Sequence, residues 1–596
     1  SCVLCAQRKV RCDRRPTGCA NCSKARVPCI YKAPPPPRRR KKGEQDLNAA
    51  DRIVAYEEAL RGLGVDPEEI VKQAVAKKRD PGASEMNCFL RPHEDEKQGN
   101  SHAPSEAGIL VSEPGRSRYL ENGIWTSLQN EFRDSKEILD ESSDDEYAET
   151  LQDEMSPPIL PVSSPSLLFG GQSPAIALRP WHPDPAQIFK LWQSYLDNVN
   201  PLVKLFHAPT VQQMISNAAG NLEDLPRNLE ALMFGIYCVS AESLTDDQCL
   251  SILGHAKVTA LQRFRSGAQF ALANASLLRT SDLMVLQAFV LFILSLQHSD
   301  ARVTWIWAGV AQRIGQRIGL HRDGAKLGVP PFEAEMRRRT WWQIMMLEGY
   351  SQKLAGTGST SVILIGDVKI PLNVNDSALF LDMKEPPPEH KGPTDMMFFL
   401  MRCYVADFLK RSADAQSNFD GLWNKLTGAS VPMSTKDKAI DELEAILEDK
   451  FLQYCDKSIP WHFMCFELGR SIVSMTRFMA HSTGYYSKAL EQSEKNNLFG
   501  LALQVVSAQN LAYTMKEMQG FIWHISLQFQ WKAFVFVLSE LCSRTMGVEV
   551  DDAWKQVEMT LQFHPSFDKN LGRRALSLAV GNLTLKAWGI YVESRG

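Results

Sequence analysis

The feature that most constrains this chain is a repeated cysteine pattern in its first 29 residues. Six of the chain's 13 cysteines lie there, and they follow the spacing C-x2-C-x6-C twice. They are Cys2, Cys5, Cys12, Cys19, Cys22 and Cys29. So ordered a repeat argues against chance and leaves two readings, a disulfide framework or a metal centre.

A metal centre explains the pattern better than disulfides do. The other seven cysteines are scattered singly along the chain, which is typical of a protein in a reducing compartment. Thiolates are soft ligands that suit zinc, and C-x2-C places two sulfurs on one tetrahedral ion. Two four-coordinate zincs need eight sulfur contacts, which six cysteines supply if two of them bridge. The repeat therefore predicts a site for two Zn²⁺ ions.

The same stretch has little else to fold around. Its apolar residues besides cysteine are few, and the main ones are Val3, Leu4, Val10, Val27 and Ile30. A segment this small cannot bury enough surface to fold alone. Zinc binding is therefore expected to supply its folding free energy.

Charge indicates what this head binds. Residues 1–42 carry 13 Lys and Arg against one acid, Asp13, whereas the whole chain has a net charge of −3. A small basic head on a large acidic body is typical of a nucleic-acid-binding protein. A merely solvated basic tail would not need a metal-dependent fold.

The head resembles the fungal binuclear zinc-cluster (six-cysteine) transcription factors. The resemblance rests on the Cys-x2-Cys pairs, on the run RKVRCD at 8–13 and on Cys-Ile-Tyr at 29–31. It implies that Cys2 and Cys19 bridge the two zinc ions. It also implies that a short helix of the first repeat enters the DNA major groove at a CGG triplet. Because the chain starts at Ser1 and not at Met, we expect further residues before Cys2.

The resemblance also assigns DNA contacts. The base-reading lysine of the family falls on Lys9, with Arg8 and Arg11 at neighbouring basic positions, and Lys or Arg donating to guanine is the commonest specific contact. The less basic second repeat is expected to contact phosphate. Two departures, Ala6 in place of a usual Arg and the loop proline Pro16 three residues before Cys19, put one phosphate contact and the loop geometry in question.

Residues 34–64 connect the head to the rest of the chain. Pro34–Pro37 predict a stiff spacer. The run RRRKK at 38–42, with Arg38, Arg39 and Arg40, is expected to clamp phosphate, to act as a nuclear import signal, or both, and the alternative is a merely solvated basic run. Residues 46–63 predict a helix with an apolar seam that ends at Gly64. Two readings stay open for this helix: a short coiled coil that forms a homodimer, or an amphipathic linker helix in a monomer.

Residues 65–175 are expected to form a largely disordered acidic linker, because they are rich in Ser, Pro, Gly and charge and lack periodicity. Two islands interrupt it. By resemblance, the segment 115–132 is expected to dock on the large domain. The segment 131–155 has 11 acids against Arg133 and Lys136. It is either an activation segment that contacts the transcription machinery or a solvated linker.

From residue 176 onward the pattern predicts helices throughout. One apolar face comprises Ile188, Leu191, Trp192, Tyr195, Leu196 and Val199, and a second comprises Val303, Ile306, Trp307, Val310, Ile314 and Ile318. Further helical runs are expected at 439–453, 463–480, 498–518 and 524–545. The apolar run 283–296 is too short for a membrane span and predicts a buried helix. The best strand signal is SVILI at 361–365.

The first half of this region resembles the fungal transcription-factor regulatory domain. The matching segments are 191–210, 311–324, 331–348 and 370–379. No motif predicts an enzyme, because GTGSTS at 356–361 lacks the phosphate-loop spacing and the run HRD at 321–323 is explained by a polar helix end. Arg337–Arg339 could bind an anion or pair with acids such as Glu333 and Glu335.

The expected fold class is mainly α, in four parts. They are a binuclear zinc-cluster DNA-binding head at 1–42, a linker helix at 43–64, a disordered linker at 65–175 and an all-helical regulatory domain at 176–596. The sequence predicts a nuclear, sequence-specific transcription factor that acts on RNA polymerase II genes, with no membrane partner. Regulation of a secondary-metabolite gene cluster follows from family prevalence alone. The alternative is a ligand-sensing or corepressor-binding protein whose DNA contact is secondary.

Overall fold

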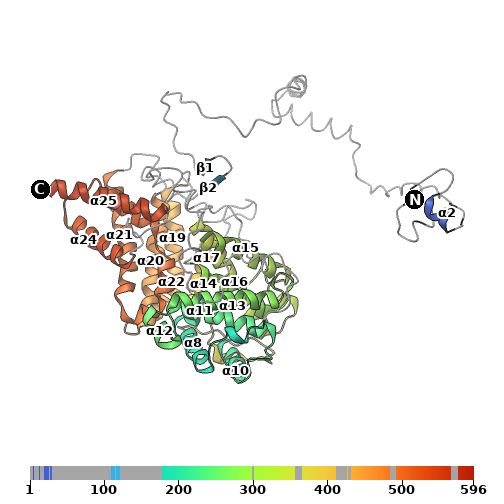
Figure 1. Ribbon diagram of the computed structural model, residues 1–596. Coiled ribbons are helices and arrows are strands. Elements are labelled where there is room, and N and C mark those ends of the chain that lie inside the picture. Colours follow the sequence, from blue (N-terminus) through green and yellow to red (C-terminus); the bar gives the residue numbers. More distant parts are fainter. Residues whose placement is uncertain are drawn as a thin grey trace, which may run out of the picture. The chain divides into compact units, whose positions relative to one another are not determined.

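The computed structural model describes two compact units, one within residues 1–100 and one within 101–596 (Figure 1). The basic run at 38–42, the linker helix at 46–63, the acidic segment 131–155, and the segments GTGSTS and SVILI lie outside the described residues. The residues described are 5, 12–13, 19–25, 27, 29, 109–113, 116–120, 177–297, 301–355, 366–410, 426, 431–482, 491–564 and 575–595.

A short β-hairpin lies in the second unit before the helices. Strands β1 (Ile109–Glu113) and β2 (Arg116–Leu120) pair antiparallel, with Glu113 opposite Arg116. The sequence between them is Pro-Gly, a dipeptide typical of turns, and it could have predicted the hairpin.

The rest of the described second unit is mainly helical, as expected. Its first half contains α8 (Pro185–Asn198), α9 (Asn200–Val203), α10 (Ala208–Ala219), α11 (Arg227–Ser243), α12 (Asp246–Leu253), α13 (Lys257–Asn274), α14 (Leu283–Leu296), α15 (Ala301–Arg317), α16 (Pro331–Ala355) and α17 (Met397–Lys410). Its second half contains α19 (Met433–Lys450), α20 (Pro460–Ser482), α21 (Gln492–Thr514), α22 (Ile522–Leu527), α23 (Trp531–Leu541), α24 (Val548–Phe563) and α25 (Ala575–Arg595).

Helix α8 shows how local sequence starts and orients these helices. Asp184 and Gln187 form a capping box, and Pro185 occupies the first turn, where its missing N–H costs nothing. The expected apolar face is buried at Ile188, Leu191, Trp192, Tyr195 and Val199, whereas Leu196 is half-buried. The helix ends just before Pro201, as the sequence predicted.

The centre of the first half is the packing of α14 against α11. Every residue from Val285 to Leu296 is buried, which confirms that the run 283–296 is a core helix. Close approach depends on Gly235, because a Cβ there would lie 2.9 Å from the carbonyl oxygen of Ala288. Among the described residues, no helix is long and apolar enough to cross a membrane.

Helix α15 corrects one predicted face. Trp307 and Ile314 are buried as expected, but the prediction for Ile306 was wrong, since its side chain is 58% exposed. The buried stripe instead runs through Ala308 and Ala311. Helix α15 packs against both α14 and α16, and its close approach to α16 is at Gly315, where a Cβ would lie 2.9 Å from the ring of Trp341.

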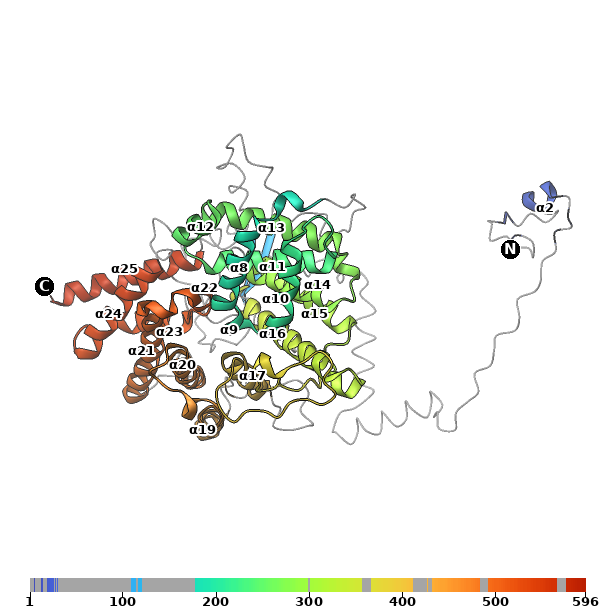
Figure 2. The same cartoon turned by 90° about the horizontal axis from the view of Figure 1, so that it is seen from below.

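The second half has its own apolar cluster, built from α20, α21, α23, α24 and α25. Figure 2 shows α19 and α20 side by side. Two arginines of α20, Arg470 and Arg477, form ion pairs with acids of α19: Asp441, Glu444 and Glu448. The single run expected over 524–545 was wrong in one respect. It breaks between Leu527 and Trp531, giving α22 and α23.

Buried ion pairs fasten the irregular segment 366–379 onto α16. Arg338 donates two 2.8 Å hydrogen bonds to Asp323, whose carboxylate also accepts from the amide of Lys369 at 3.0 Å. Arg339 donates to Glu335 at 3.0 Å and to Asp376 at 2.6 Å. The arginine run therefore pairs with acids, the second of the two readings left open by the sequence.

The ion pair of Asp323 with Arg338 makes a prediction for stability. Burial alone would raise the pKa of Asp323, but the bonds from Arg338 and from backbone amides outweigh burial and lower this pKa to about 2. The stabilisation is therefore complete above the unfolded-state pKa of about 4 and is lost as the pH falls toward 2. We expect Asp323→Asn to lower the free energy of unfolding by about 3 kcal/mol at pH 7, and the deficit to shrink below pH 4. Denaturant unfolding followed by circular dichroism measures both.

The matched control is Glu333→Gln on α16, the helix that carries Arg338. Glu333 is 53% exposed and lies 3.7 Å from Arg337, so its loss should cost less than about 1 kcal/mol at any pH. Equal losses for the two variants would contradict the role given to Asp323.

Candidate metal centre

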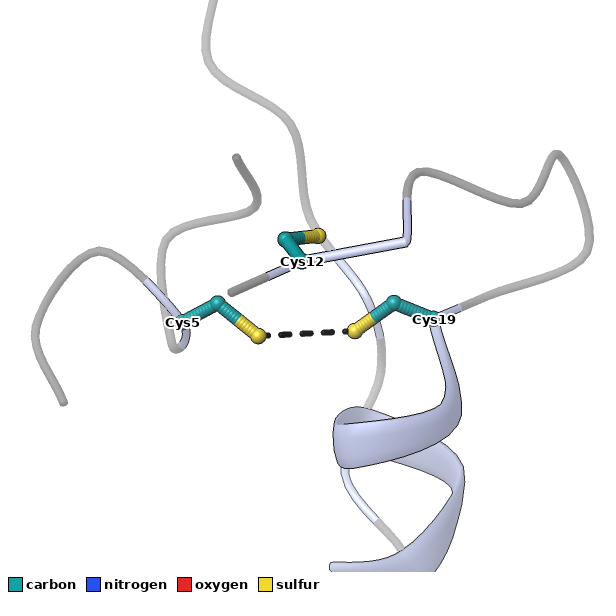
Figure 3. Close-up of side chains that lie close together, drawn as sticks. All are labelled: Cys5, Cys12 and Cys19. Carbon is teal, nitrogen blue, oxygen red and sulfur yellow. Dashed lines mark hydrogen bonds between the residues drawn. The ribbon is translucent and has the colours of Figure 1, made fainter. Parts of the chain in front are cut away.

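The described cysteines of the head lie together in space. Cys5, Cys19 and Cys22 are buried, and Cys12 and Cys29 are half-buried against them. Figure 3 shows the side chains of Cys5, Cys12 and Cys19 converging from three separate segments of the chain. In the described part of the head these five side chains are the whole of the buried apolar cluster.

The thiols form two groups that share one member. Cys5, Cys12 and Cys19 make the first group, and Cys19, Cys22 and Cys29 make the second. Within each group the Sγ atoms lie within 4.8 Å of one another. Among the described residues, potential ligand side chains gather in threes only here.

The sulfur spacing fits a metal rather than a disulfide. The Sγ atoms of Cys5 and Cys19 are 3.6 Å apart. A disulfide would bring them to about 2.05 Å. Two sulfurs on one tetrahedral zinc, each about 2.3 Å from the ion, lie about 3.8 Å apart. The donor chemistry and this separation therefore both suit zinc.

Backbone geometry places the shared thiol. Helix α2 (Ala20–Lys24) begins directly after Cys19, and the Sγ of Cys19 accepts a 3.4 Å hydrogen bond from the amide of Cys22. The amide of Cys19 in turn donates to the Sγ of Cys29 at 3.4 Å. Hydrogen bonds to sulfur favour the thiolate, which is the form that binds metal.

Two polar side chains that the sequence analysis did not assign support this arrangement. The carboxylate of Asp13 accepts hydrogen bonds from the amide of Ala20 at 3.1 and 3.4 Å, which ties the first repeat to the start of α2. The Nδ2 of Asn21 donates to the Sγ of Cys5 at 3.7 Å. Asp13 follows Cys12 directly and is the one acid of the head, a signal that could have identified it.

The structure does not describe the remaining predicted site residues. Cys2 and the expected DNA contacts Arg8, Lys9, Arg11, Arg38, Arg39 and Arg40 lie outside the described residues. They stay predictions.

Two buried cysteines of the large unit are poor candidates for a metal site. Burial raises the pKa of Cys238 to about 12 and raises that of Cys465 as well. Thiols held protonated in this way are poor nucleophiles and poor ligands.

Comparison with known families gives two matches. Residues 1–39 match the fungal Zn(2)-Cys(6) binuclear cluster domain, and residues 192–374 match the fungal specific transcription factor domain. The first match contains all six cysteines of the head. The second contains Asp323, Arg338 and Arg339 of the buried ion-pair network.

Comparison over the whole chain gives several similar proteins, each of them aligned over 72–80% of its own length. The chain is 34% identical to pyriculol/pyriculariol biosynthesis cluster transcription factor 1 of Pyricularia oryzae, across all of this chain and 78% of that protein. It is 34% identical to the aurofusarin cluster transcription factor aurR2 of Gibberella zeae, across 83% of this chain and 72% of that protein. It is 29% identical to the transcriptional regulator AacuB of Aspergillus aculeatus, across 99% and 80%.

The shared position of Cys19 makes a prediction about zinc content. If Cys19 serves both groups, Cys19→Ala should remove zinc from both sites, leaving well under one zinc per chain, because each ion loses a ligand. Elemental analysis of purified protein measures this. The large unit should keep its helical circular dichroism and its unfolding midpoint.

The matched control is Cys455→Ala, at a half-buried cysteine of the large unit. This variant should retain two zincs per chain. A Cys19→Ala protein that still holds two zincs would contradict a shared ligand.

Proposed function

Because the chain belongs to the fungal Zn(2)-Cys(6) transcription factors, we propose that it controls one biosynthetic gene cluster through a DNA-reading head whose fold depends on a shared thiolate. The chain is a zinc-dependent, DNA-binding regulator of transcription and not an enzyme, and its cluster domain holds two Zn²⁺ ions. The observation that carries the proposal is the pair of thiol groups that meet at Cys19.

One more cysteine, Cys2, would complete both groups of zinc ligands. Each group of three thiols lacks one ligand for a tetrahedral ion. Cys2 precedes Cys5 by the C-x2-C spacing, and as a second bridge it would supply the fourth sulfur to both ions. The proposed ligands are therefore Cys2, Cys5, Cys12, Cys19, Cys22 and Cys29, with Cys2 and Cys19 bridging.

Bound zinc would act as the core of the head rather than as a catalyst. The cysteine sulfurs would hold the two repeats against each other, and Asp13 would fix the start of α2 relative to the first repeat. Lys9 lies between the ligands Cys5 and Cys12, so the metal would hold both ends of the segment that presents it. We propose that Lys9 reads guanine and that Arg8, Arg11, Arg38, Arg39 and Arg40 contact phosphate or neighbouring bases.

The division of the chain follows the same reasoning. We propose that the head at 1–42 is joined through the segments 43–64 and 65–175 to a regulatory domain at 176–596, and that the protein acts in the nucleus. Pairing of two copies through 46–63 would set the distance between half-sites on DNA.

Regulation of a gene cluster rests on the names of two similar proteins, both described as biosynthesis or cluster transcription factors. Chromatin immunoprecipitation in the source fungus should show enrichment at promoters of one biosynthetic cluster, and deletion of the gene should change those transcripts. Binding dispersed over unrelated promoters, with unchanged cluster transcripts, would contradict this proposal.

Lys9 and Arg38 give the sharper test on DNA, because each replacement by alanine removes one positive charge. If Lys9 donates to guanine, Lys9→Ala should cost about 1–3 kcal/mol on a CGG-containing site and relax specificity at that base. Arg38→Ala should weaken binding to all duplexes alike and reduce the salt slope by about one. Affinities for the CGG site and for a scrambled duplex, over a salt series, measure both.

A charge-only account gives a different result. It requires equal losses for Lys9→Ala and Arg38→Ala on both duplexes. If Lys9→Ala lowers both affinities by the same factor, Lys9 contacts phosphate and the proposed reading segment is wrong.

A further inference from the structure

One side chain of helix α2, Asn21, reaches across to the other repeat of the head. Its Nδ2 donates a hydrogen bond to the Sγ of Cys5 at 3.7 Å, and Cys5 lies on a segment separate from α2 (Figure 3). The Sγ atoms of Cys19 and Cys29 accept instead from backbone amides, which any residue but proline supplies. The contact to Cys5 therefore depends on which side chain stands at position 21.

A second contact, in the opposite direction, fixes the place of Asn21. The carboxylate of Asp13, in the first repeat, accepts hydrogen bonds from the amide of Ala20 at 3.1 and 3.4 Å. Ala20 is the first residue of α2 and directly precedes Asn21. Asn21 itself is exposed, so packing of its side chain does not explain its position beside Cys5. Two polar contacts that need no metal thus join the repeats and bring Asn21 to a proposed zinc ligand.

The cysteine repeat shows that this contact cannot occur twice. A shift of 17 residues places the first three cysteines of the head on the last three. The same shift relates Asn21 to Leu4 and Asp13 to Ile30. Neither Leu4 nor Ile30 has a hydrogen-bonding side chain. Cys5 therefore receives a side-chain donor that the equivalent thiol of the second repeat cannot receive in the same way.

A donor to a zinc-bound thiolate opposes loss of the metal. It stabilises the negative charge on the sulfur and fixes the direction of the ligand. Outer-shell partners of metal ligands typically contribute about 10–100-fold to metal affinity. Because Asn21 is exposed and its bond to sulfur is long, we expect a smaller contribution, about 3–10-fold.

We propose that Asn21 is a positioning residue for the zinc site of Cys5, Cys12 and Cys19, where its amide holds the Cys5 thiolate and slows the loss of zinc. The inference rests on the ligand set of the proposed function and adds a residue that binds no metal. Asn21 governs how long the head stays loaded with zinc and not which DNA sequence it reads.

Zinc release from the full, zinc-loaded chain to an excess of the chelator 4-(2-pyridylazo)resorcinol tests the proposal. Asn21→Leu removes the donor, and the repeat already has leucine at the equivalent position, Leu4. Asn21→Asp keeps the shape of the side chain but offers only acceptors when ionised. We expect at least one phase of release to be about 3–10-fold faster in Asn21→Leu. Release should be faster still in Asn21→Asp, because its carboxylate repels the thiolate.

An effect on helix α2 alone gives the opposite result. Leucine is a better helix former than asparagine, and an acidic side chain in the first turn of a helix is favourable. If Asn21 served only α2, both variants would release zinc at the wild-type rate or more slowly.

The matched control is Ser23→Leu. Ser23 is exposed on α2, and among the described residues its side chain has no hydrogen bond to a cysteine sulfur. This variant should not release zinc faster than the wild type. With zinc in excess, Asn21→Leu should bind a CGG-containing duplex within about 2-fold of the wild-type affinity, as expected for a surface change away from the DNA contacts.

Replacement of zinc by cobalt(II) gives a spectroscopic readout. In Asn21→Leu the sulfur-to-cobalt charge-transfer bands should move to longer wavelength, because loss of the hydrogen bond raises the energy of the sulfur electrons. Ser23→Leu should leave these bands unchanged.

Three results would overturn the proposal. They are unchanged release in both Asn21 variants, slower release in both, and unchanged release with weaker DNA binding in excess zinc, which would make Asn21 a DNA contact. A wild-type chain that holds two zincs, with unchanged release in the variants, would reject the role of Asn21 and leave the proposed function intact. A wild-type chain that holds fewer than two zincs would contradict the ligand set and this inference together.

Discussion

The head depends on a sulfur cluster in place of an apolar core. Its described buried residues are cysteines alone, and Cys19 belongs to both thiol groups. A core of this kind buries too little apolar surface to be stable without metal. Metal coordination and folding are therefore one equilibrium. The proposed DNA contacts that lie between the ligands in sequence would then depend on that equilibrium.

In the large unit, buried ion pairs hold separate segments of the chain together. Four sequence segments that resemble the family meet around α16, and polar contacts fix where they meet. Asp323 joins Arg338 to the amide of Lys369, and Asp376 joins Arg339 to the amide of Ala208. An irregular segment such as 366–379 lacks the regular backbone hydrogen bonds of a helix or a sheet. Carboxylates can hold it in place because each accepts several hydrogen bonds, including those from backbone amides.

Several features could be predicted because their cause is local. The helices α8 and α14 follow from apolar spacing, capping residues and length, and the structure confirms both. The cysteine spacing predicted two zincs, and the match to the cluster domain confirms that number. Ile306 could not be placed, because the side of α15 that is buried depends on where α14 and α16 pack against it, and that is not a property of the α15 sequence alone. The break after Leu527 likewise has no glycine or proline to mark it, since the chain continues as Gln-Phe-Gln before Trp531.

The sequence by itself determined the kind of protein. Cysteine spacing, the basic head and the helical body are properties of neighbouring residues, and metal preference, charge and helix periodicity act over a few residues. Tertiary structure alone decided which distant groups meet. It brought Cys5 to within 3.6 Å of Cys19, and Asp376 to Arg339. These contacts join residues that are far apart along the chain, and their energies depend on burial and on the partners present, which no single stretch of sequence contains.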